Sequence, residues 1–109
     1  MAYDESLAER LREMLAPHRG ISEKKMFGGI GFLLNGNMCV GVWKNDLILR
    51  IGRAIYEQTL TEPCVKEFDI TGRAMTGWVL VEPEGVVTDE DLVDWVRLAT
   101  EFTGSLPAK

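Results

Sequence analysis

The stretch that decides the fold is KKMFGGIGFLLNGNMCVGVWKNDLILRI, residues 24–51. Its apolar side chains alternate with a period of two, which is typical of strands that bury one face. Asn35 and Gly36 supply the positive φ angles of a two-residue hairpin turn, and a second turn is expected at residues 44–46. The stretch therefore predicts an antiparallel meander of about three or four strands. The alternating positions are Ile30, Phe32, Leu34, Val40, Val42, Leu47, Leu49 and Ile51.

Segments with helical periodicity precede and follow this meander in the sequence. Residues 4–16 carry apolar side chains at helical spacing and predict an amphipathic helix, and residues 53–61 predict a short middle helix. Two short strands are expected at 66–70 and 75–81, and Thr88 is expected to cap a last helix that runs to about residue 103. The chain is thus predicted to be one α+β domain, residues 1–109, with an antiparallel meander sheet and N-terminal, short middle and C-terminal helices packed on it. The buried stripe of the last helix is expected to contain Leu92, Trp95, Val96, Ala99 and Phe102.

Composition excludes several classes of function. The chain has 109 residues, 46% of them hydrophobic, which suits one domain with an ordinary core. It carries 12 Lys and Arg against 17 Asp and Glu, a net charge of −5, so we do not expect direct nucleic-acid binding. The longest mostly apolar run, residues 26–34, is far shorter than the roughly 18 residues of a membrane span. Cys39 and Cys64 form no CxxC pair and favour free thiols, so we expect a cytoplasmic protein.

No pattern in the sequence indicates an active site. His18 is the single histidine and lies in a turn after the first helix. Cys39 is expected to be a buried small hydrophobe, and Cys64 has the same interpretation less strongly. The glycines of residues 28–31 precede a strand, whereas phosphate-binding glycine loops precede a helix, so a bulge, a tight bend or a close approach of the backbone to an aromatic ring is favoured. We expect no catalytic residue, no metal and no cofactor.

The remaining candidates are four cations. Lys24 and Lys25 open the first strand of the predicted meander, and Arg50 and Arg53 close its last strand. If these strand ends lie near each other, they form a patch that binds an anion or docks a partner. The alternative is that they are ordinary edge charges that prevent pairing with another chain. Tyr56 borders this region, although core packing is the favoured interpretation.

Several segments carry a resemblance to a known family. Residues 24–38 and 46–50, together with 72–75, 78–83 and 92–95, resemble the N-terminal domain of the TfoX/Sxy family, regulators of competence genes in bacteria. The resemblance covers nearly the whole chain, and the basic-Met-Phe-Gly-Gly string is its most specific part. It implies an α+β domain with a regulatory or binding role and without known catalysis. Longer family members carry a second, helical domain, which residues 1–109 do not include.

Two classes of function stay open. The first is a cytoplasmic interaction module that binds a protein partner, or forms a homodimer, and has no chemistry of its own. The second is a sensor of a small anionic ligand or nucleotide, or an uncharacterised enzyme, in which the same cations hold an anion. No membrane association is expected.

Overall fold

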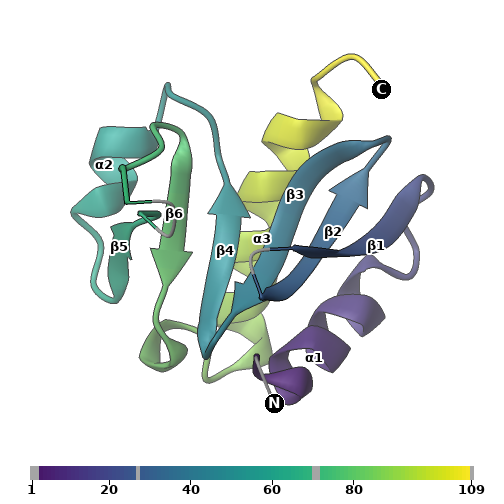
Figure 1. Cartoon of the computed structure of the whole chain (residues 1–109), viewed down its shortest axis with the longest axis horizontal. Helices are drawn as coiled ribbons and strands as arrows, with labels where there is room; N and C mark the ends of the chain where they lie inside the picture. Colours follow the sequence, from purple (N-terminus) through teal and green to yellow (C-terminus); the bar gives the residue numbers. More distant parts are fainter. Residues whose placement is uncertain (1–2, 27, 70–71, 109) are drawn as a thin grey trace.

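The computed structural model describes residues 3–26, 28–69 and 72–108 (Figure 1). Its strands form one sheet of six strands in the order β1-β2-β3-β4-β6-β5, and every pair of neighbours is antiparallel. The expected α+β class is confirmed. The strands are β1 (Ile21–Met26), β2 (Gly29–Leu34), β3 (Asn37–Trp43), β4 (Asp46–Arg50), β5 (Val65–Glu67) and β6 (Trp78–Val81), and the helices are α1 (Glu5–Leu15), α2 (Tyr56–Leu60), the short 3-10 helix η1 (Pro83–Gly85) and α3 (Asp89–Gly104).

Strands β1 to β4 form the predicted meander. Asn35 and Gly36 have φ angles of 54° and 85°, as the hairpin prediction requires, and Lys44 has a φ of 54° in the next turn. The register between β2 and β3 shifts at Phe32 and Leu33, which accommodates one extra residue on β3. The prediction was wrong about the start of the first strand, because β1 begins at Ile21 and places the lysine pair in its second half.

The second half of the sheet departs further from the prediction. Strand β6 pairs with β4, and β5 lies outside it as the opposite edge. Both strands are shorter than expected, and α2 begins at Tyr56 instead of residue 53. Since α2 and β5 separate β4 from β6 in the sequence, local turn chemistry gave no signal that β6 lies next to β4.

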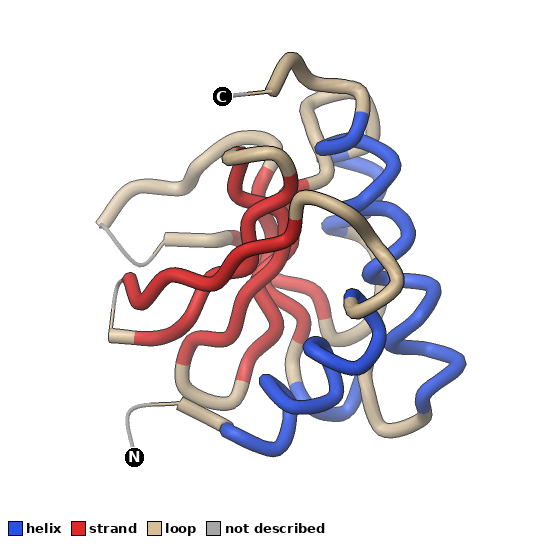
Figure 2. The backbone as a smooth tube through the Cα atoms, turned by 90° about the vertical axis from the view of Figure 1, so that its right-hand side faces the viewer, coloured by secondary structure: helices blue, strands red, loops and turns tan. Residues whose placement is uncertain are grey.

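The helices α1 and α3 lie on one face of the sheet (Figure 2). Asp4 caps α1 by accepting hydrogen bonds from the backbone N–H groups of Ser6 and Leu7, and Thr88 caps α3 as predicted, accepting from the backbone N–H of Asp91 at 3.1 Å. In the buried stripe of α3, Leu92, Val96 and Ala99 are buried as expected, Thr103 joins them, and Trp95 and Phe102 are only half-buried. None of the described helices is long and apolar enough to cross a membrane.

Apolar side chains pack on both faces of the sheet. The main core lies between the sheet and the helices and includes Leu11, Phe32 and Leu49. A smaller cluster lies on the face without α1 and α3, where Phe68 from the loop after β5 packs with Ile48 and Leu80. The sheet is therefore covered most completely near β4 and β6, and least completely at β1.

The glycines of the meander allow close strand packing. A Cβ atom on Gly29 would collide with the carbonyl oxygen of Val42, and one on Gly31 would meet the Sδ atoms of Met26 and Met38. The predicted close approach is present, but its partners are a backbone carbonyl and methionine side chains, not an aromatic ring. The sequence pattern also predicts a core position for Phe27, which lies outside the described residues.

Candidate functional site

The lysine pair lies on the outer strand of the sheet. Lys24 and Lys25 are exposed and adjacent on β1, so their side chains point to opposite faces. In the described part of the chain, neither forms an ion pair or a side-chain hydrogen bond. Lys24 is opposite Gly31 and Lys25 is opposite Ile30. The pair is therefore a concentration of positive charge that no described acidic residue neutralises.

The two arginines lie elsewhere. Arg50 ends β4, opposite Trp78, and its guanidinium carbon lies 5.3 Å from the Trp78 ring centroid and 5.8 Å from that of Phe102. These distances are typical of cation–π contacts, so Arg50 is engaged with aromatic rings. Arg53 is exposed in the loop before α2.

The structure does not bring the four cations together. β1 and β4 are three strand positions apart, about 14 Å at the usual strand spacing. The register also places Lys25 in the row of Leu47, at the other end of β4 from Arg50. The expectation that the strand ends lie close together is wrong, because the first and fourth strands of a meander are its two sides. The binding role of each residue stays a prediction.

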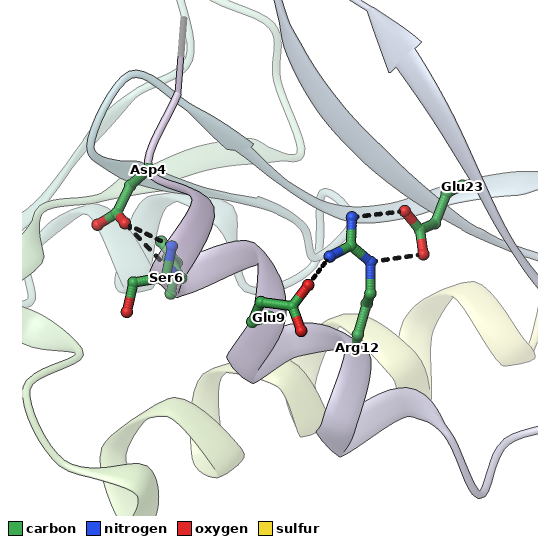
Figure 3. A network of polar contacts seen from close by, with 6 residues as sticks. Asp4, Ser6, Glu9, Arg12 and Glu23 are labelled. Atoms are coloured by element: carbon green, nitrogen blue, oxygen red, sulfur yellow. Dashed lines mark hydrogen bonds and ion pairs between the residues drawn. The ribbon is translucent and has the colours of Figure 1, made fainter. Parts of the chain in front are cut away.

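A polar network ties Glu23 on β1 to α1 (Figure 3). Arg12 donates from Nε and Nη2 to the two carboxylate oxygens of Glu23, at 2.7 and 2.9 Å, and also contacts Glu9. This paired geometry is the strong form of an arginine–carboxylate contact. The Arg12 hydrogen bond lowers the pKa of Glu23, and the same contacts raise the pKa of Arg12. Sequence reasoning missed this network, since nothing in the sequence shows which helix face lies under which strand.

The opposite edge of the sheet, strand β5, is protected against pairing with a strand of another chain. Strand β5 has 3 residues against 6 in β1. Its Lys66 forms an ion pair with Asp46 at 3.0 Å and approaches Glu82 at 4.0 Å, and the hydrogen bond to Asp46 raises the pKa of Lys66. The β1 edge is therefore longer than the β5 edge, and its lysines form no ion pair in the described residues, whereas Lys66 on β5 does.

The candidate catalytic groups do not assemble into a site in the described residues. Cys39 is buried as predicted, and burial raises the pKa of its thiol while Thr103 and the charge of Arg50 act in the opposite direction. Cys64 is a half-buried free thiol with a φ of 67°. His18 is exposed and borders a shallow hollow of about 470 Å³ with Glu13, but no hydrogen bond joins them.

The described residues also bear on metal and phosphate binding. No group of three or more potential metal ligands is found in the described ranges. The glycine run leads into strand β2 and not into a helix, which contradicts a phosphate-binding loop and agrees with the structural interpretation. Tyr56 is buried on α2, in the main core as favoured.

Comparison with models of known protein families gives a match over most of the chain. The family model described as "TfoX N-terminal domain" matches residues 13–103, from the C-terminal part of α1 to the last turn of α3. No curated protein and no solved structure matches the chain. Because the match covers the whole sheet and most of the chain, the protein belongs to the TfoX N-terminal domain family.

Proposed function

We propose that this domain is a non-catalytic protein-interaction module with a regulatory role, and that it binds its partner through Lys24 and Lys25. The observation that carries the proposal is the position of the two lysines: adjacent, exposed, unpaired in the described residues, and on the outer strand β1. An acidic surface on a partner gains two attractive contacts there without displacing any described intramolecular ion pair. The family membership supports the regulatory part of the proposal.

The other proposed properties follow from charge and chemistry. A net charge of −5 disfavours direct binding to nucleic acid, since phosphates need clustered cations. We place the domain in the cytoplasm, which its two free thiols support. A small anionic ligand would need converging cations, and the strand order separates Lys24 from Arg50. For this reason we favour a macromolecular partner over a metabolite or nucleotide.

The test is charge reversal with a matched control. The double variant Lys24→Glu/Lys25→Glu changes the net charge by the same amount as Arg53→Glu/Arg73→Glu, and both arginines are exposed. Each tagged variant is purified from the native cells after circular dichroism has verified its fold. We expect the lysine variant to lose the proteins that co-purify with the wild type, and the arginine variant to retain them. Loss with the arginine variant, or an unchanged set with the lysine variant, contradicts the proposal.

A further inference from the structure

The free side of β1 carries main-chain groups that have no partner strand. The Asn35 backbone N–H donates to the Gly20 carbonyl at 2.9 Å, so these residues form a hydrogen-bonded pair across the hairpin. In an antiparallel ladder such pairs recur at every second residue. The N–H and C=O groups of Ser22, Lys24 and Met26 therefore point to β2, and those of the intervening residues point outward. The outward set is Ile21, Glu23 and Lys25.

These outward groups are accessible for pairing. No hydrogen bond from them to another element is found in the described part of the chain. β1 is the outermost strand of the sheet, with α1 beneath one face and no strand on its free side (Figure 1). An open strand of 6 residues is long enough to template an added strand, whereas the 3 residues of β5 are not.

Charge decides what kind of strand is accepted. Glu23 is bound by Arg12, so its negative charge is neutralised within the chain. The uncompensated charge of the edge is then that of Lys24 and Lys25, one on each face of the sheet. An incoming strand with acidic residues at two consecutive positions opposes both lysines at once.

The same charges oppose pairing with a second copy. Two copies can join their β1 strands antiparallel around a two-fold axis. Directly opposed side chains then lie on the same face of the sheet, so the axis must pass through a residue that is opposite its own copy. Centring on Lys24 or on Lys25 opposes two lysines. Like charges that face each other directly destabilise such a pair. The lysine-centred registers are therefore disfavoured between two copies, whereas an acidic strand from a different chain meets no such repulsion.

From these observations the geometry points to strand addition: an extended acidic peptide pairs antiparallel with β1 as a seventh strand, with its two acidic residues opposite Lys24 and Lys25. This rests on the proposed function and specifies how the partner binds. The peptide forms main-chain hydrogen bonds with Ile21, Glu23 and Lys25, and the lysines select its sequence.

A designed peptide tests the geometry. The probe is acetyl-valine-glutamate-glutamate-threonine-threonine-valine-amide. Its first residue is designed to lie opposite Met26 and its sixth opposite Ile21, so the two glutamates face Lys25 and Lys24. It is titrated into the 15N-labelled wild-type domain up to about 1 mM, the range of weak complexes, and followed by NMR. We expect amide exchange with solvent to slow at Ile21, Glu23 and Lys25 and to stay unchanged at Ser22 and Lys24. Absence of binding at this concentration, or protection confined to other strands, overturns the proposal.

Two matched variants of the probe separate main-chain pairing from charge attraction. N-methylation of its fourth residue removes the N–H that faces Glu23 and should abolish binding. N-methylation of its fifth residue, whose N–H faces away from β1, should leave the affinity unchanged. Replacing both glutamates by lysine, or using Lys24→Glu/Lys25→Glu, should weaken binding about tenfold or more. Equal affinities for the two N-methylated peptides overturn strand addition. If charge reversal at the lysines still abolishes capture of the partner in that case, the proposed function stands and only the strand-addition geometry is wrong.

Discussion

Arg12 is the side chain that joins the N-terminal helix to the edge strand. Its guanidinium contacts both oxygens of Glu23 and also Glu9, so one residue of α1 holds two carboxylates (Figure 3). The contact with Glu23 has two consequences. It fixes the position of β1 over α1, and it removes a negative charge from the strand that carries Lys24 and Lys25.

The stability that this pair contributes should depend on pH. Because Arg12 lowers the pKa of Glu23 below its ordinary value of 4.5, the contribution is fully present above that value and is lost as the pH falls through the lower folded-state pKa. The Glu23 side chain is 39% exposed, so solvent screening limits the effect. We expect Glu23→Gln to lower the free energy of unfolding by at most about 1 kcal/mol at neutral pH.

Urea denaturation at a series of pH values checks this expectation. The difference between wild type and Glu23→Gln should shrink as the pH falls from about 5 to about 3. Glu13→Gln is the control, since Glu13 is exposed on α1, next to Arg12, and has no ion pair in the described residues. A difference that is constant over this range would show that the pair contributes no pH-dependent stability.

Sequence reasoning at the residue scale succeeded where the cause is local. The cap of Thr88 follows from its place before an apolar periodic run, and the burial of Cys39 follows from its place in the second hairpin strand. The Arg12–Glu23 pair could not be found in this way. It depends on how α1 crosses the sheet, and that is set by packing of the whole core.

The central strands of the sheet owe their close packing to glycine. A Cβ atom on Gly41 would lie 2.6 Å from the carbonyl oxygen of Ile30 and 3.3 Å from the Cα atom of Gly31. Both neighbours are backbone atoms of β2 and cannot move without shifting the strand. A Cβ atom on Gly31 would instead meet the flexible ends of Met26 and Met38, with the Met38 sulfur at 2.8 Å.

The two glycines should therefore respond differently to the same substitution. We expect Gly41→Ala to lower the free energy of unfolding by about 1–3 kcal/mol, because β2 and β3 must separate locally. Gly31→Ala should stay within about 1 kcal/mol of wild type, because methionine side chains rearrange and alanine restricts the unfolded chain. Chemical denaturation of both variants measures the difference. Equal destabilisation would mean that the methionines are as rigid as the backbone.

The structure confirms the predicted meander. The meander was predictable because its period of two and its turn chemistry are properties of consecutive residues. The position of β6 between β4 and β5 was not predictable in the same way, since α2 and β5 come between β4 and β6 in the sequence. The candidate site shows the same limit. The sequence identified Lys24 and Lys25 as exposed strand residues, but only the strand order separates them from Arg50.

At the scale of the whole molecule, the sheet has two unlike edges on a domain of net charge −5. The β5 edge is short, and its Lys66 is paired with Asp46. The β1 edge is long, and its lysines are unpaired in the described residues. Repulsion between lysines of two copies is then a barrier to edge-to-edge association at β1.

Removal of this barrier should change the oligomeric state. We expect Lys24→Thr/Lys25→Thr to self-associate more strongly than wild type, because threonine favours strands and leaves the outward main-chain groups at positions 21, 23 and 25 open to a second copy. Sedimentation velocity over a range of protein concentrations measures the effect. Arg53→Thr/Arg73→Thr removes the same charge from exposed loop positions and should sediment as wild type does. If both variants associate equally, net charge and not the β1 edge controls self-association, and the selectivity argued for that edge is lost.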